Sequence, residues 1–138
     1  MGAWGHGIFD DDTAMDRVEM VQHVKHPEAF FAEAFDKANS TDYLEYGDCH
    51  SVIISAAYMD AMLNETEYVI EGCEDEDYFN KFNKNNISLN LVPLKPDAVS
   101  ALEVILSEKS ELQELWAENE ELYPLWKTNV EALMQRLR

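Results

Sequence analysis

The spacing of apolar residues predicts a chain built mostly of helices. From residue 12 or 13 to about Val24, apolar positions fall near one face of a helix, with Asp12 as the expected N-cap. Pro27, a favoured first residue of a helix, begins a second stretch that keeps the helical period as far as Ala38. The polar run at 39–42 ends this helix, because its side chains compete for backbone hydrogen bonds.

A third helix, predicted at 48–63, has a different character. Nearly every position in it is apolar, and the small residues at 55–57 would let neighbouring elements approach closely. A helix that is apolar nearly all round is usually buried in the middle of a domain. We therefore expect this helix at the centre.

The last third of the chain predicts three more helices. One begins at Asp97 and presents an apolar side as far as Leu106, and a shorter one follows Ser110, a good N-cap. The last one begins near Leu122, which requires Pro124 to lie in the first turn. Its apolar positions form a continuous seam to Leu137.

Between 64 and 96 the pattern is weak. Short strands are predicted at 68–70 and 87–92, on either side of a highly acidic stretch. The fold class expected from the whole pattern is a mostly α, compact bundle of about five or six helices. It forms one domain over 1–138, with a short strand pair in the acidic insertion at about 64–96.

The charge of the chain restricts its possible partners. There are 28 Asp and Glu residues against 10 Lys and Arg, a formal net charge of -18 in 138 residues. Such a chain repels nucleic acid phosphates and anionic membranes, so we expect neither as a partner. Its natural partners are cations or basic proteins. With no membrane-spanning run and no signal core, the expected location is cytoplasmic.

The acidic insertion is the predicted contact surface for a basic protein. Long loops are often functional, and this one combines carboxylates with two aromatic residues that could anchor a partner. The predicted contact residues are Glu71, Glu74, Asp75, Glu76, Asp77, Tyr78 and Phe79.

We expect neither a metal site nor a cofactor site, because no complete motif for either is found in the sequence. A calcium loop starting at Asp75 would need Gly where Asn80 stands and Glu where Asn86 stands. Neither a His-Glu-x-x-His run nor a phosphate-binding glycine loop after a strand occurs. The one acid of catalytic interest is Asp60, on the apolar central helix. If buried, it would have a raised pKa and could act as an acid or base; the interpretation we favour places it on the helix's one wet stripe.

The opening segment is the most distinctive string in the chain. Its glycines suit an unusual backbone path, and its aromatic residues can fill a core. We expect a packed N-terminal cap; the alternative is a site built from Trp4, His6 and the three aspartates at 10–12. The motif residues are Trp4, Gly5, Gly7, Phe9, Asp10, Asp12 and Asp16.

On this motif the chain resembles an uncharacterised bacterial family of small domains of unknown function. Met1 to Asp16 match the family's opening pattern, and weaker similarity continues at 43–45, 56–57, 110–116 and 126–133. The chain departs from the family at Asp11, often Asn there, and at Arg17, often Trp. The resemblance implies a compact helical fold in a bacterial cytoplasm and no established reaction.

Three functions from different classes remain open. The first is an acidic protein-binding module, an immunity protein or antitoxin that neutralises a basic bacterial toxin such as a nuclease. The second is a small enzyme or metal-dependent protein that uses the N-terminal aspartates or Asp60. The third is a self-associating scaffold; the sequence leaves the oligomeric state open.

Overall fold

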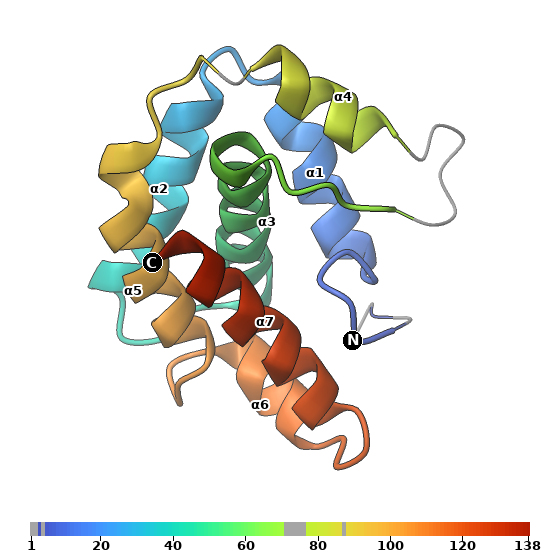
Figure 1. Cartoon of the computed structure of the whole chain (residues 1–138). Helices are drawn as coiled ribbons and strands as arrows, with labels where there is room; N and C mark the ends of the chain where they lie inside the picture. Colours follow the sequence, from blue (N-terminus) through green and yellow to red (C-terminus); the bar gives the residue numbers. More distant parts are fainter. Residues whose placement is uncertain (1–2, 4, 71–76, 87) are drawn as a thin grey trace.

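A computed structural model describes residues 3, 5–70, 77–86 and 88–138 (Figure 1). Among these residues the chain forms seven α-helices and one short 3₁₀ turn, η1. They are α1 (Asp12–His23), α2 (Pro27–Ser40), α3 (Tyr46–Asn64), α4 (Tyr78–Asn85), η1 (Val92–Leu94), α5 (Lys95–Ile105), α6 (Glu111–Ala117) and α7 (Tyr123–Leu137). No helix in the described ranges is long and apolar enough to cross a bilayer.

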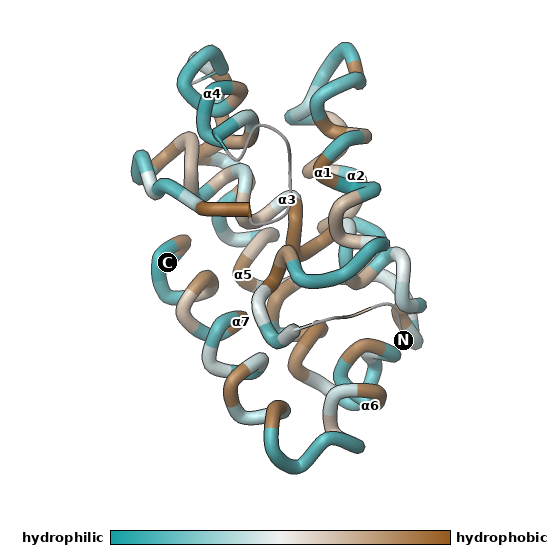
Figure 2. Tube along the Cα trace, turned by 90° about the vertical axis from the view of Figure 1, so that its right-hand side faces the viewer, coloured by the Kyte–Doolittle hydropathy of each residue, from teal (hydrophilic) through white to brown (hydrophobic). Residues whose placement is uncertain are grey.

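Helix α3 is the centre of the fold, as its apolar sequence predicted. Every residue of α3 from Val52 to Met62 is buried. Helices α1, α2, α5 and α7 pack round it, and α4 covers one end (Figure 1). The outer helices alternate between hydrophobic and hydrophilic positions along their length (Figure 2), which is the pattern of helices with one face in the core.

Aromatic residues fill the space between α3 and its neighbours. Tyr58 of α3 lies against Phe31 of α2 and against Phe79 of α4, with ring centroids 5.9 and 4.4 Å apart. The Tyr58 hydroxyl donates a hydrogen bond of 2.8 Å to the carbonyl of Val18 in α1. One buried side chain of α3 therefore contacts three other helices and still has its polar atom satisfied.

A short parallel bridge joins two distant segments of the chain. The Leu44 N–H donates to the Lys109 carbonyl at 2.6 Å, and the Glu111 N–H donates to the Leu44 carbonyl at 3.0 Å. Ser110 lies between them, fully buried, and its hydroxyl accepts a hydrogen bond from the Gln113 N–H at the start of α6. This bridge brings the start of α3 beside α6.

The predicted strand pair is absent from the described residues. Residues 68–70 form neither strand nor helix, η1 takes up the end of the second predicted strand, and Ile87 lies outside the described residues. The side chain of Asn80 explains the first difference. Its Nδ2 donates to the Tyr68 carbonyl and its Oδ1 accepts from the Tyr68 N–H, at 2.8 and 3.0 Å, as a strand partner would.

Helix α4 is the one α-helix among the described residues that the sequence pattern did not predict. Its asparagines favour turns, so local propensity argued against a helix there. Phe79 is fully buried and Phe82 packs against the core, and this burial outweighs the low propensity. The N-cap of α1 also differs from the expected Asp12: Asp11 caps it, accepting hydrogen bonds from the N–H groups of Thr13 and Ala14. The N-cap predicted at Ser110 is confirmed, and Pro124 lies in the first turn of α7 as expected.

Replacing Ser110 by Ala should lower the free energy of unfolding by about 1 kcal/mol, because α6 loses its N-cap acceptor. Ser40→Ala is the matched control, because the Ser40 hydroxyl is exposed and bonds only within its own helix end; it should change stability by less than about 0.5 kcal/mol. Urea denaturation of the two variants and the parent protein measures the difference. Equal stabilities would show that the bridge does not depend on this cap.

Candidate functional site

The N-terminal motif forms a tight turn around the carboxylate of Asp10. The Gly7 N–H donates to Asp10 Oδ2, and the Asp10 N–H donates to the Gly7 carbonyl, both at 3.1 Å. A Cβ atom added to Gly5 or Gly7 would lie 2.6 or 2.7 Å from Asp10 Oδ2. A side chain at either position would therefore displace the Asp10 carboxylate, which approaches both glycines closely.

Other motif residues divide between the core and the solvent. Phe9 is buried, with its ring edge-on to Tyr68 and Phe79 at centroid distances of 5.4 and 5.1 Å. Asp12 and Asp16 are exposed on α1, and Trp4 lies outside the described residues. His6 is exposed, and its carbonyl accepts a hydrogen bond from the Asn129 side chain of α7. Of the described motif residues, Phe9 therefore contributes to the core, whereas Asp12 and Asp16 face solvent.

Asp11 is the most polar point beneath this cap. It is 3% exposed, accepts a hydrogen bond from the Tyr46 hydroxyl, and lies 3.4 Å from Nε2 of His50. Burial alone would raise the pKa of Asp11, but the contacts with His50, Tyr46 and the Ala14 N–H together lower it well below its ordinary value. The adjoining cavity has a volume of about 10 Å³, room for one water molecule.

Asp60 is fully buried, so the interpretation that placed it on a wet stripe was wrong. Its Oδ1 accepts from Asn64 Nδ2 at 2.8 Å and from Thr66 Oγ1 at 3.0 Å. Its Oδ2 accepts from Arg136 Nε at 2.8 Å and from the Tyr68 hydroxyl. The carboxylate joins α3, the segment after it and α7.

The surroundings of Asp60 also correct the expected direction of its pKa. Burial raises the pKa, but hydrogen bonds from Asn64, Tyr68 and Arg136, with the charge of Arg136, lower it overall. The group stays ionised at neutral pH, whereas an acid or base catalyst needs a pKa near the working pH. The geometry gives Asp60 a structural role.

The predicted contact surface is only partly described. Glu71, Glu74, Asp75 and Glu76 lie outside the described residues, and Asp77 is exposed at the start of α4. Tyr78 is half-buried and packs against the core. Phe79 is fully buried between Phe9, Tyr58 and Tyr68, so it is not available as an anchor for a partner.

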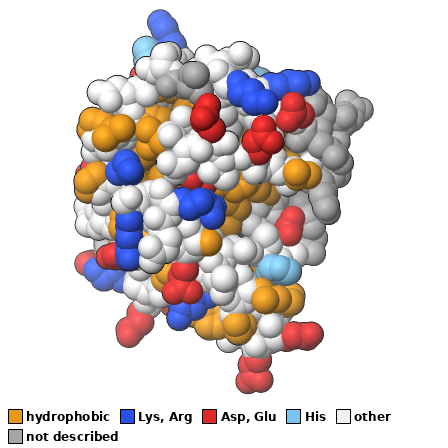
Figure 3. Space-filling view, viewed as in Figure 1, with side chains coloured by type: hydrophobic (Ala, Val, Ile, Leu, Met, Phe, Trp, Pro, Cys, Tyr) orange, Lys and Arg blue, Asp and Glu red, His pale blue; other side chains and the backbone are white. Residues whose placement is uncertain are grey.

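A second acidic surface, which we call the acidic end, is created by the bridge between Leu44 and Ser110. The bridge brings together segments 42–46 and 108–121, which carry eight acids and one basic residue, Lys109. Acidic side chains project from the lower edge of the molecule in Figure 3, where Figure 1 places α6. The eight acids are Asp42, Glu45, Glu108, Glu111, Glu114, Glu118, Glu120 and Glu121.

Tyr43 is an exposed aromatic residue within this acidic end. It is 43% exposed, and its hydroxyl donates a 2.9 Å hydrogen bond to Glu114 Oε2. Its partial burial and the neighbouring carboxylates of Glu114 and Glu111 raise the pKa of Tyr43 to about 12. Glu111 also accepts a hydrogen bond from the Tyr46 N–H at 2.7 Å, which fixes α6 against the start of α3.

Sequence reasoning missed several of these residues. Tyr43 gave no signal, because its acidic neighbours come from a segment that is distant in the chain. The pairing of Arg136 with Asp60 also had no signal in the sequence. Asn80 and Asn83 did carry one: they are three residues apart, which puts them on the same face if the segment is helical. Among the described residues, no group of three or more potential metal ligands comes together.

Gly7→Ala should destabilise the protein by about 1 kcal/mol, because the new Cβ displaces the Asp10 carboxylate from the Gly7 N–H. Asp10→Ala should cost a similar amount. The double variant should cost clearly less than the sum of the two, since the clash and the lost hydrogen bond involve the same carboxylate. Thermal unfolding of the four proteins measures this coupling, and strictly additive losses would contradict the turn geometry.

Asp60→Asn should cost about 2–3 kcal/mol at pH 7, because it leaves Arg136 without its counter-charge. The value is at the lower end for a buried pair because 39% of the Arg136 side chain is exposed. The folded-state pKa of Asp60 is lowered, so its contribution is present above the ordinary value of 3.8 and is lost as the pH falls through the folded value.

The stability difference between the parent protein and Asp60→Asn should therefore shrink below pH 3.8, as urea denaturation at several pH values would measure. Asp42→Asn, which changes an exposed acid, controls for the general effect of charge. A difference that stays constant to pH 2 would contradict the lowered pKa.

Comparison with protein families supports the family resemblance seen in the opening segment, although it identifies the family and not the motif. No curated protein and no solved structure matches the chain. A family model described as a domain of unknown function, DUF4259, matches residues 2–129 of the 138. The match covers the N-terminal cap, the central helix and the acidic end, and the chain belongs to this family of domains of unknown function.

Proposed function

We propose that this protein is an acidic protein-binding module that neutralises a basic partner. The kind of protein that fits is an immunity protein or antitoxin whose partner is a basic toxin such as a nuclease. The observation that carries the proposal is the acidic end, with an exposed tyrosine among its carboxylates. No bound cofactor, metal or nucleic acid is part of the proposal.

The charge supports this function through long-range attraction. A nuclease needs positive charge to hold its nucleic acid, so a dense negative surface attracts the same region. Opposite fields speed the encounter between two proteins and disfavour wrong partners. The eight acids and one lysine of the acidic end give such a field, in a chain whose formal net charge is already -18.

Tyr43 supplies the short-range part of the proposed contact. Exposed tyrosines are frequent energetic centres of protein interfaces, especially when surrounded by polar groups. The hydrogen bond to Glu114 holds its ring in one position before binding, which reduces the entropy lost on association. Tyr43 therefore replaces Phe79 as the proposed aromatic anchor for the partner. The segment 71–77 remains a predicted second contact through its five acids.

The first experiment identifies the partner and tests its charge. The tagged protein is captured from its own host at low salt, and the co-purifying protein is identified, purified and assayed for toxicity or nuclease activity with and without this protein. We expect a basic protein whose activity is lost at equal molar amounts. A partner that is acidic, or one whose activity is unchanged in the complex, would sink the proposal.

The second experiment tests the surface. Replacing Glu114, Glu118, Glu120 and Glu121 by Gln should slow association by about tenfold at low salt and flatten its salt dependence. The matched control changes the same amount of charge on α1 and α2, at the exposed Asp16, Glu19, Glu33 and Asp36. Stopped-flow association rates at several salt concentrations distinguish the two. Equal slowing by both sets would show that net charge acts without a specific surface.

A further inference from the structure

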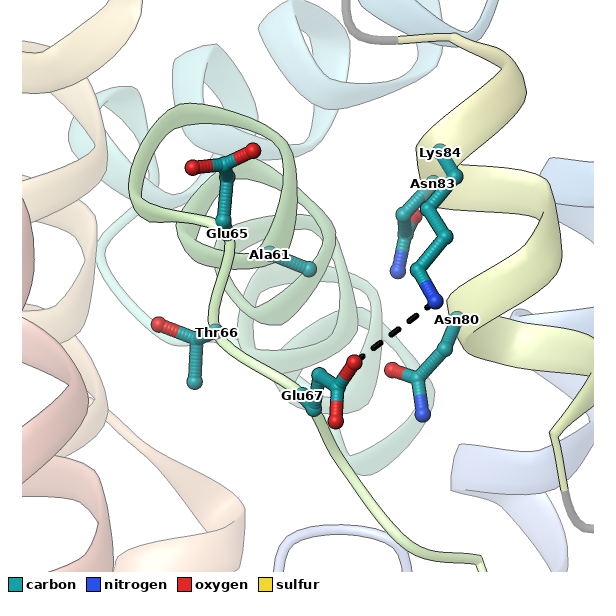
Figure 4. Close-up of a pocket in the computed structure, with 7 residues that line it drawn as sticks. All are labelled: Ala61, Glu65, Thr66, Glu67, Asn80, Asn83 and Lys84. Atoms are coloured by element: carbon teal, nitrogen blue, oxygen red, sulfur yellow. Dashed lines mark ion pairs between the residues drawn. The ribbon is translucent and has the colours of Figure 1, made fainter.

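A cavity of about 190 Å³ lies between the C-terminal end of α3 and α4, at the opposite end of the molecule from α6 (Figures 1 and 4). Ala61 and the segment 65–67 form one side, and polar residues of α4 form the other. Its volume suits a group the size of one amino-acid residue, since a 150 Å³ cavity in another protein holds benzene. None of the contacts that maintain the acidic end involves these residues.

The α4 side of the cavity shows how an asparagine at this place binds a peptide group. Asn80 pairs through both its oxygen and its nitrogen with the carbonyl and N–H of one residue, Tyr68. Residues 68–70 form neither helix nor strand, so the Tyr68 backbone groups are free to pair with this side chain. Asn80 thus has both its oxygen and its nitrogen paired inside the protein.

Asn83, one turn further along the same helix face, has no such partner. It is 3% exposed, and neither its Oδ1 nor its Nδ2 makes a hydrogen bond among the described residues. Its side chain extends from α4 toward Ala61 (Figure 4). Buried polar side chains are nearly always hydrogen-bonded in proteins, and each exception calls for an explanation. Both atoms are shielded from solvent, so a ligand reaches them only when the Asn83 side chain turns toward the cavity. A ligand with a donor and an acceptor side by side would then satisfy both atoms.

Charged residues stand at the mouth of the cavity. Lys84 Nζ and Glu67 Oε1 form an ion pair of 3.6 Å across it (Figure 4). Both side chains are about two-thirds exposed, so the pair is weak and its partners exchange readily. Glu65 also lines the cavity, but its carboxylate points away from Glu67 and Lys84 (Figure 4). A cation can therefore replace Lys84 beside Glu67, and the formal net charge of -18 on the chain favours a cation over an anion at this surface.

We propose that this cavity binds an extended, positively charged peptide segment. One residue of the peptide offers its N–H and carbonyl to Asn83, in the way that Tyr68 offers them to Asn80. A neighbouring lysine or arginine of the peptide replaces Lys84 beside Glu67. This inference stands on α4 and the end of α3, and does not depend on the function proposed for the acidic end.

The probe is the tripeptide Arg-Ala-Arg, acetylated at its N-terminus and amidated at its C-terminus. Titration followed by the NMR signals of the Asn83 side-chain amide and of the backbone at Ala61 and Lys84 should show saturable shifts. Glu-Ala-Glu with the same end groups should give none. An ester analogue that lacks the alanine N–H should bind about tenfold more weakly, since it leaves Asn83 Oδ1 without a donor.

Two matched variants separate a binding role from a structural one. Asn83→Leu should lose at least about tenfold in peptide affinity, while its melting temperature stays equal or rises, because an unpaired buried amide is removed. Asn80→Leu should lower the melting temperature, because it unpairs the Tyr68 backbone. Glu67→Gln should weaken binding of the peptide, and Glu114→Gln should leave it unchanged.

The proposal is overturned if the parent protein shows no saturable shifts at millimolar peptide, or if Asn83→Leu binds the peptide as the parent does. It is also overturned if the ester binds as tightly as the amide. Free argininamide tests a small ligand in place of a peptide; equal affinity for it would refute recognition of an extended chain. None of these outcomes bears on capture of a basic protein through the acidic end.

Discussion

The fold depends on burying α3 together with the polar groups that it carries. Asp60 is the most demanding of these, because a buried carboxylate without partners would cost several kcal/mol. Its four hydrogen bonds come from its own helix, from the segment that follows and from α7. The same contacts that keep Asp60 ionised therefore fix the position of the last helix, α7. The buried carboxylate thus contributes to the arrangement of the helices as well as to the stability of the fold.

The six amphipathic or apolar helices were predictable, because their spacing records which face is buried. Helix α4 and the segment before it were not, since Asn80 replaces a strand partner through its side chain and no local pattern encodes that pairing. The burial of Asp60 was mistaken for exposure because its partner, Arg136, lies 76 residues further along the chain. The acidic end was missed for the same reason: only the bridge at Leu44 assembles it.

The two ends of the molecule use charge in different ways. At the acidic end, carboxylates gather on an exposed surface with Tyr43 among them, which suits attraction over a distance. At the other end, Glu67 and Lys84 lie at the mouth of a cavity that is lined by the unpaired Asn83 amide. This arrangement suits recognition of a ligand through direct contacts. The N-terminal motif belongs to neither of these two surfaces. Its glycines and Asp10 form a tight turn next to the core, and Asp11 caps α1.

The bridge between Leu44 and Ser110 has a consequence for how this chain folds in different solutions. The two segments that it joins are far apart in sequence: Tyr46 and its hydrogen-bonding partner Glu111 are 65 positions apart. In the unfolded chain their carboxylates lie too far apart to repel strongly, and closing the bridge crowds them together. Dissolved ions that shield this repulsion thus favour the native state, and dilute media oppose it; a cationic protein resting on the same surface would act as a permanent counter-ion.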